Sequence, residues 1–436
     1  MPLKTVRKTT ALHLLLPLLC LAVTACSMGR LVPKAEEPTV LRKSLRISPD
    51  ARGVAYIADL RDKRKRFVVV GGKKGRQYDD IRRDTLTFNP ADPGGGRGTP
   101  GINHVAYAAK DGGRWFIVAG GKEGKRYNGI AKRSPVFSPD GKHLAYAAKK
   151  EGKWFVVADG KEGKPYNSVV DCTIAFSPDG RHMAYAANEG KEWFIVMDGE
   201  EGKRYDAILR DSPVFSPDGR RLAYVAKRNR KWFVVVDGKG GKRYDAILKD
   251  SITFSPDGKR LAYAARKDKK WFIVVDGKRG PGYYIVRKNT IAFSPDGKRL
   301  AYAAGAGKKE HFVVVDGKEG ERYRAIAPGS LFFSPDGKRM AYAASEDKEW
   351  FVVVNGEHGP GYDAIVRGSI GFLPDGRMLY AVREGEEHLL VMDEGTMTLA
   401  EDIYVRSGSI VFDAPDTLRY LVKKDGEFYP VEERIE

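Results

Sequence analysis

The sequence predicts an all-β fold: a single closed β-propeller of about ten four-stranded blades, the last of them completed by the N-terminal strand. Three observations support this prediction. A string of a dozen residues recurs every 39 or 40 residues, short β-prone runs alternate with turn signals, and the two chain ends supply complementary parts of one blade. Of the 436 residues, 42% are hydrophobic and 31% are charged, which is typical of a folded chain.

The N-terminal segment differs from the rest of the chain. Three basic residues precede the apolar run ALHLLLPLLCLAV, which is short for a membrane span and fits a secretory signal peptide. The run ends in VTAC, which resembles the lipobox of bacterial lipoproteins. That resemblance implies cleavage before Cys26, lipidation of this cysteine, export, and sorting to the outer membrane in Gram-negative families. An ordinary signal peptide that happens to contain a cysteine is the alternative. We expect a signal peptide at 1–25, a linker at 26–37 and the propeller at 38–436.

Charge and cysteine content narrow the classes of partner. The formal net charge is +19, and residues 1–25 carry three basic and no acidic side chains, which leaves +16. Such a charge favours anionic lipid headgroups, acidic glycans or an acidic protein surface, and export disfavours nucleic acid. Cys20 leaves with the signal peptide and Cys26 would carry lipid. Cys172 is then the sole remaining thiol, so no intrachain disulfide is expected.

The serine of the string FSPDG serves as the landmark of each repeat, and weaker copies extend the series at both ends. Ten units of about forty residues then cover nearly everything after residue 40, as in a propeller or a solenoid. The landmark falls at Ser48, Asn89, Ser138, Ser177, Ser216, Ser255, Ser294, Ser334, Leu373 and Asp413.

Residues 252–284 illustrate the strands of one unit. SITFS, RLAYAA, KKWFIVVDG and GKRGPGYYIV follow one another, and each run is bounded by Gly, Pro or Asp. SPDG has turn chemistry at every position, since proline presets φ and glycine relieves strain. Four strands in a meander make one propeller blade, whereas solenoid turns usually hold fewer elements.

The chain ends favour closure into one ring. Pro38–Ser44 aligns with Asp245–Ser251, so the N-terminus is expected to supply a lone fourth strand, while Ser409–Glu436 has room for the first three. One shared blade would leave no exposed sheet edge. Two five-bladed rings are the alternative, but the spacing stays regular across the middle of the chain, which favours a single ring.

The repeat FSPDGKRLAYAA…WFIVVDG resembles the PD-type, WD-like propeller repeat of TolB and of the propellers of prolyl-oligopeptidase relatives, over about residues 39–436. The resemblance implies the fold and not an activity. The α/β domain that precedes the propeller in TolB has no counterpart in this sequence.

A hydroxyl residue occupies one position of every unit, four residues before the landmark. Two explanations fit: a hydrogen bond that ties blades together or caps a turn, or a polar lining of the mouth of the channel. These residues are Ser44, Thr85, Ser134, Thr173, Ser212, Ser251, Thr290, Ser330, Ser369 and Ser409.

A cation occupies most units two residues earlier, in the connection from the fourth strand to the next first strand. We expect this connection on the face opposite the PDG turns, where a ring of cations would concentrate an anionic partner. The alternative is that these cations belong to solvated turns, which keep the blades soluble and bind no partner. The cations are Arg42, Arg83, Lys132, Arg210, Lys249, Lys288 and Arg367, with exceptions at Asp171, Pro328 and Ser407.

No catalytic or metal-binding motif stands out. The G-x-S-x-G, H-E-x-x-H and C-x-x-C patterns do not occur, and the aspartates of the PDG turns are explained by turn chemistry. We therefore predict a non-enzymatic, lipid-anchored envelope protein that uses no cofactor or metal and binds a protein or an anionic envelope polymer. A propeller enzyme such as a glycan lyase or hydrolase, with its site at the channel mouth, is the alternative, and a structural filler without a small ligand is a third hypothesis.

Overall fold

A computed structural model describes residues 39–41, 44–49, 53–60, 64–90, 104–170, 173–385, 387–393, 395–398, 411–414, 417–424 and 427–434. The chain divides into two units, Met1–Glu37 and Pro38–Glu436. The expected signal peptide, linker and lipidation site lie outside the described residues. So do Arg42, Asp171, Cys172, Ser407 and Ser409. Among the described residues, no helix has the length and hydropathy needed to cross a membrane.

The described residues form ten antiparallel sheets, and the first nine share one plan. In the sixth sheet, β26 (Ala246–Ile247) and β27 (Thr253–Phe254) occupy the same first edge, since both pair with β28 (Leu261–Lys267). β28 then pairs with β29 (Lys270–Val275), which pairs with β30 (Lys278–Tyr283). Each sheet therefore has four strand positions, the first of them interrupted.

The remaining strands repeat this plan and are given in chain order. The first three sheets comprise β1 Thr39–Val40, β2 Arg46–Ile47, β3 Val54–Leu60, β4 Lys65–Val70, β5 Lys73–Lys74; β6 Asp80–Ile81, β7 Thr87–Phe88, β8 Val105–Asp111, β9 Arg114–Ala119, β10 Lys122–Glu123; and β11 Gly129–Ile130, β12 Val136–Phe137, β13 Leu144–Lys150, β14 Lys153–Ala158, β15 Lys161–Glu162. The fourth and fifth sheets comprise β16 Ser168–Val169, β17 Ala175–Phe176, β18 Met183–Glu189, β19 Glu192–Met197, β20 Glu200–Glu201; and β21 Ala207–Ile208, β22 Val214–Phe215, β23 Leu222–Arg228, β24 Lys231–Val236, β25 Lys239–Gly240. The seventh and eighth sheets comprise β31 Ile285–Val286, β32 Ala292–Phe293, β33 Leu300–Gly305, β34 His311–Val315, β35 Lys318–Glu319; and β36 Ala325–Ile326, β37 Phe332–Phe333, β38 Met340–Glu346, β39 Glu349–Val354, β40 Glu357–His358. The last two sheets comprise β41 Ala364–Ile365, β42 Gly371–Phe372, β43 Met378–Glu384, β44 Glu387–Met392, β45 Gly395–Thr398; and β46 Val411–Ala414, β47 Thr417–Lys424, β48 Glu427–Arg434.

The predicted fourth strand is split between two sheets. Tyr244 pairs with Trp232 on the outer edge of the fifth sheet, while β26, two residues further on, pairs with the sixth sheet. In the same way β1 pairs with β3 in the first sheet, and within the described residues the last sheet consists of β46, β47 and β48. The prediction that the N-terminal strand completes the last blade is therefore wrong, because the aligned segment joins the sheet that follows it in the chain.

Neighbouring sheets pack face to face, and the large side chains of one sheet lie against the small side chains of the sheet before it. Successive residues of a strand point to opposite faces, so LAYAA in β28 presents Leu261 and Tyr263 on one face and Ala262 and Ala264 on the other. The larger face packs on the fifth sheet and the alanine face receives the seventh. Tyr263 also meets Tyr244 edge to face, with the ring centroids 6.2 Å apart. The small residues make room for the next sheet's aromatic rings.

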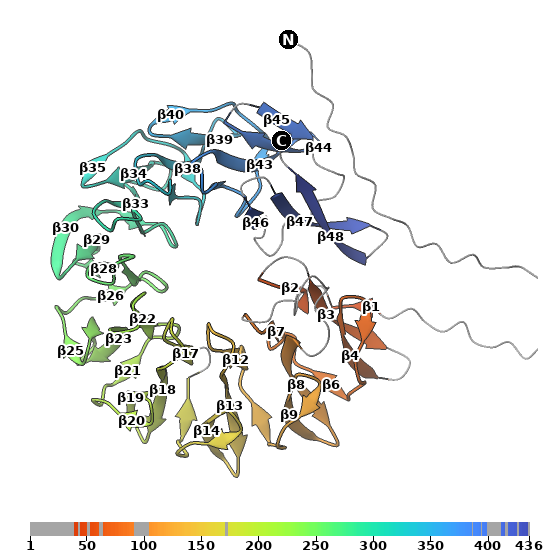
Figure 1. Cartoon of the computed structure of the whole chain (residues 1–436). Coiled ribbons are helices and arrows are strands. Elements are labelled where there is room, and N and C mark those ends of the chain that lie inside the picture. The colour runs from red at the N-terminus through yellow and green to blue at the C-terminus, as the bar shows by residue number, and fades with distance from the viewer. Residues whose placement is uncertain are drawn as a thin grey trace, which may run out of the picture. The chain divides into compact units, whose positions relative to one another are not determined.

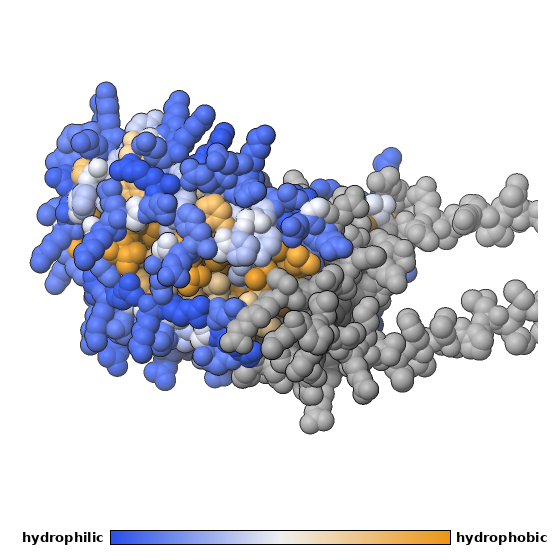
Figure 2. All heavy atoms as spheres, turned by 90° about the horizontal axis from the view of Figure 1, so that it is seen from above, coloured by the Kyte–Doolittle hydropathy of each residue, from blue (hydrophilic) through white to orange (hydrophobic). Residues whose placement is uncertain are grey.

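The first edges of neighbouring sheets lie close together, and we call the region that these edges form the converging edge. β2 contacts β7, β17 contacts β22, and β37 contacts both β32 and β42. Figure 1 shows the sheets following one another in chain order, and β48 of the last sheet contacts β3 of the first. In Figure 2, long hydrophilic side chains project along both margins of the sheets, with an apolar band between them.

Candidate functional site

The segment that interrupts each first edge forms a tight turn, which we call the cross-over turn. In the sixth sheet it covers residues 248–252, between β26 and β27. The Ser251 hydroxyl donates a hydrogen bond to the carbonyl oxygen of Leu248 (2.7 Å) and accepts one from the amide of Ala264 in β28 (3.1 Å). Because these backbone groups face a gap in strand pairing, the hydroxyl supplies the partners that the interrupted ladder lacks.

The other repeats use the same hydrogen bond. All nine described hydroxyls are buried, with at most 6% of each residue exposed, and each accepts a bond from a backbone amide of its central strand. These hydroxyls therefore lie inside the sheet, where the backbone engages them. They are Ser44, Thr85, Ser134, Thr173, Ser212, Ser251, Thr290, Ser330 and Ser369.

The cations lie on the same turns. The register places each turn beside the middle of the central strand, not beyond its far end, so the cations belong to the converging edge rather than to a face opposite the PDG turns. Within the described residues five of them are exposed and form no ion pair. These are Arg83, Lys132, Arg210, Lys288 and Arg367.

Lys249 differs from these five because it has an acidic partner. Its Nζ lies 2.7 Å from Asp211 of the preceding cross-over turn, and this hydrogen bond raises the pKa of Lys249. Arg133 also lies 3.8 Å from Asp211. Further along, the amide of Gly329 donates to the carbonyl of Asn289 (3.0 Å). Neighbouring cross-over turns are therefore close enough to be bridged by one ligand.

The PDG turns are internally satisfied. The Ser255 hydroxyl donates to Asp257 Oδ1 (2.5 Å), which also accepts from the amide of Lys259, and the two bonds lower the pKa of Asp257. Gly258 has φ +68°, and a Cβ there would lie 3.0 Å from Asp218 Oδ1 of the preceding turn. The glycine is therefore required both for its backbone conformation and for the close approach of the neighbouring turn.

Arginines at the start of the central strands join consecutive sheets. Arg260 donates from Nη1 to the carbonyls of Gly297 (2.9 Å) and Lys298 (2.8 Å), and its guanidinium lies over the Phe293 ring at 5.1 Å. Its Nε lies 3.5 Å from Asp276 of its own sheet. Arg221, Arg299 and Arg339 make corresponding contacts. Their charge serves packing between sheets, a role that the sequence patterns did not reveal.

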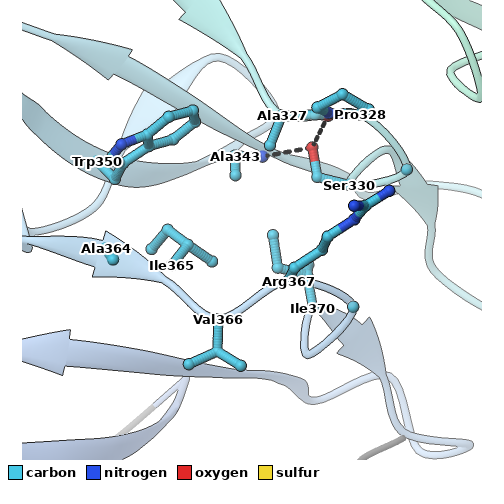
Figure 3. A pocket seen from close by; sticks show the side chains of 12 residues that line it. Ala327, Pro328, Ser330, Ala343, Trp350, Ala364, Ile365, Val366, Arg367 and Ile370 are labelled. Carbon is cyan, nitrogen blue, oxygen red and sulfur yellow. Dashed lines mark hydrogen bonds between the residues drawn. The ribbon is translucent and has the colours of Figure 1, made fainter. Parts of the chain in front are cut away.

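A cavity of about 330 Å³ opens between the eighth and ninth sheets at the cross-over turns. Its lining combines the Trp350 indole, Ile365, Ile370 and the Pro328–Ser330 turn with one charged side chain, Arg367. Figure 3 shows Arg367 extending toward the turn that carries Ser330, whose hydroxyl is bonded to Ala327 and Ala343. We call this the 8/9 cavity. Sequence reasoning missed it, although Pro328 had broken the cation pattern.

The described residues contain no group of three or more His, Cys, Asp or Glu side chains that could hold a metal ion. The arrangement therefore offers buried hydroxyls engaged by the backbone, exposed cations and an apolar cavity.

Repeated four-stranded antiparallel sheets, packed face to face with converging first edges, define an all-β repeat protein of the propeller type. No family model matches the sequence, and no curated protein matches it. Among solved structures, the chain is similar to a eukaryotic initiation factor, with 12% identity and a TM-score of 0.42, over 77% of this chain and 94% of that chain. It is also similar to TolB from Acinetobacter baumannii, with 16% identity, a TM-score of 0.26, and 63% and 77% coverage. An oligogalacturonate lyase in complex with manganese matches with 14% identity, a TM-score of 0.32, and 61% and 88% coverage.

Proposed function

We propose that the protein is a non-enzymatic binding propeller whose converging edges recognise an anionic partner in the cell envelope. The observation that carries the proposal is the contrast between two sets of cations. The arginines at the start of the central strands, Arg260 and its counterparts, are engaged by carboxylates and carbonyls. In contrast, Arg83, Arg210 and Lys288 of the cross-over turns form no ion pair within the described residues. Exposed unpaired cations attract an anion without first having to break an existing pair.

The proposed architecture is one ring of ten blades. The contact between β48 and β3 supports it, because closure brings the last sheet next to the first. Closure would place the unpaired cations around a common channel and focus their field between low-dielectric walls.

The proposed location is the outer membrane, through a lipid on Cys26. The VTAC string supports this proposal. Replacement Cys26→Ala should give an uncleaved or soluble product, and acylated membrane-bound protein from this variant would overturn the assignment. The test is radiolabelled palmitate incorporation followed by membrane fractionation.

The binding proposal is tested by pull-down from an envelope extract at low and moderate salt. Three baits are compared: the native chain, a variant with Arg83→Glu, Arg210→Glu and Lys288→Glu, and a control with Lys142→Glu, Lys259→Glu and Lys298→Glu on the PDG turns. Both variants change the net charge equally. A partner that is retained by the control and lost by the cross-over variant would support the proposal. Equal capture by all three baits would refute it.

A further inference from the structure

The 8/9 cavity has a counterpart in the repeat, which permits a position-by-position comparison. A cavity of about 240 Å³, which we call the 5/6 cavity, lies between the fifth and sixth sheets. Its lining includes Leu209, Asp211, Ser212, Val225 and Asp250. In the aligned repeats these positions hold Ala327, Gly329, Ser330, Ala343 and Gly368 in the 8/9 cavity. The two cavities therefore occupy equivalent places in the repeat, and they differ in the side chains that line them.

The interior of the 8/9 cavity is enlarged by loss of aliphatic groups. Alanines replace Leu209 and Val225, and the lining then reaches Trp350. The strand residue opposite Trp350 is Ser345, whereas the corresponding Lys227 lies over the Trp232 ring at 5.3 Å. The indole of Trp350 is therefore left available to an apolar group, which would gain free energy by burial against it.

The rim differs in charge as well. At the 5/6 cavity two carboxylates, Asp211 and Asp250, stand on the rim, and Lys249 is paired with one of them. At the 8/9 cavity glycines replace both acids, and Arg367 forms no ion pair among the described residues. A carboxylate would be repelled at the first site and attracted at the second.

An exposed aromatic residue follows the cross-over turn that lines the cavity. Phe332 follows the same cross-over turn and is 37% exposed, one of two large hydrophobic residues that are exposed among the described ones. Smaller residues, Val214, Thr253 and Gly371, occupy this position in other sheets. On the other side, Lys288 precedes Asn289, which bonds to Gly329. Cations therefore flank the apolar turn on both sides.

We propose that the 8/9 cavity binds an acidic peptide segment of a partner protein. One apolar side chain enters the cavity against Trp350, and acidic residues beside it meet Arg367 and Lys288. A purely polar polyanion would leave the apolar lining unfilled, which is why the observations favour a polypeptide with both kinds of side chain. The inference rests on the proposed function and names the chemistry of the partner.

The test uses fluorescence anisotropy with the full chain purified in detergent and three labelled peptides. EDEFEDE carries the acidic and apolar groups, EDESEDE has the same charge without the aromatic ring, and QNQFQNQ has the ring without charge. We expect EDEFEDE to bind at least about tenfold tighter than either control. EDESEDE lacks the apolar side chain that would be buried, and QNQFQNQ lacks the carboxylates that would meet Arg367 and Lys288.

Two variants restore residues of the other cavity. Ala327→Leu fills the cavity with the residue found at Leu209 and Leu248, so the fold should accept it. Gly329→Asp restores a rim carboxylate, and the equivalent Asp211 and Asp250 both have positive φ (56° and 59°), as Gly329 does. Ala327→Leu should remove the difference between EDEFEDE and EDESEDE, and Gly329→Asp should weaken both acidic peptides several-fold. Ala131→Leu, the same change at the same repeat position, is the control and should leave binding unaltered.

The outcomes separate the two proposals. Equal binding of EDEFEDE and EDESEDE that falls with Arg210→Glu and Lys288→Glu would overturn the cavity inference and leave the proposed function standing. Preference for QNQFQNQ over both acidic peptides would overturn both. Undiminished binding of EDEFEDE by Ala327→Leu, or binding of free N-acetylphenylalanine as tight as that of EDEFEDE, would also overturn the peptide site.

Discussion

Replacing Ser251 by alanine is expected to destabilise the protein through the backbone rather than through lost packing. The hydroxyl is buried, donates to the carbonyl of Leu248 and accepts from the amide of Ala264. Its removal leaves two buried backbone groups without partners, each at a cost of about 1–3 kcal/mol. We therefore expect the free energy of unfolding to fall by about 2–6 kcal/mol.

The assay is guanidinium denaturation followed by tryptophan fluorescence, combined with hydrogen exchange at the Ala264 amide. Protection of that amide should fall by about 30- to 20,000-fold, since each factor of ten corresponds to about 1.4 kcal/mol. Ser251→Thr is the matched control, because threonine performs the same role at Thr85, Thr173 and Thr290. Unchanged stability and unchanged exchange in Ser251→Ala would refute the role assigned to the hydroxyl.

Three further changes test the turns and the contacts between sheets. Gly258→Ala should lower stability by about 1–3 kcal/mol, whereas Gly277→Ala, with open space around its Cβ, should cost about 1 kcal/mol, as measured by chemical denaturation. Arg260→Lys keeps the charge but loses the planar guanidinium, whose Nη1 donates to two carbonyls and whose plane lies over the Phe293 ring. We expect a loss of about 1–2 kcal/mol of stability, seen as a lower melting temperature, and an unchanged melting temperature would contradict the role assigned to this contact. The folded-state pKa of Asp257 is lowered, so its contribution is complete above about pH 4 and is lost as the pH falls through the folded pKa. In the variant Asp257→Asn, stability should therefore fall less on acidification below about pH 4 than in the native protein. The same dependence of the free energy of unfolding on pH in both proteins would contradict the role assigned to the Asp257 carboxylate.

Turn chemistry and strand composition predict most of the fold, because SPDG and DG set the turn positions and leave short β-prone runs between them. The pairing of the fourth run was predicted wrongly. From Tyr244 to Ile247 the alternation of side chains is equally compatible with the outer edge of one sheet and the first edge of the next, so sequence periodicity cannot distinguish the two partners.

Sequence reasoning identified the positions of the hydroxyls and cations but not their surroundings. Whether a hydroxyl such as Ser251 faces solvent or the backbone depends on a gap in strand pairing that has no signature in the pattern. The 8/9 cavity was missed because it arises from side chains that are small or absent, at Ala327 and Gly329. Its signal was the departure of APGS from the LRDS and LKDS of earlier repeats.

Each first edge consists of two pieces of chain that meet at a cross-over turn. β26 and β27 both pair with β28, although Lys249 and Asp250 separate them. Cutting the chain between these two residues would leave β26 on an N-terminal fragment and β27 and β28 on a C-terminal one, with the pairing of Ala246 and Arg266 still joining them. The cross-over turns therefore divide the protein into fragments with complementary edges, a natural basis for reconstituting it from two separately produced halves.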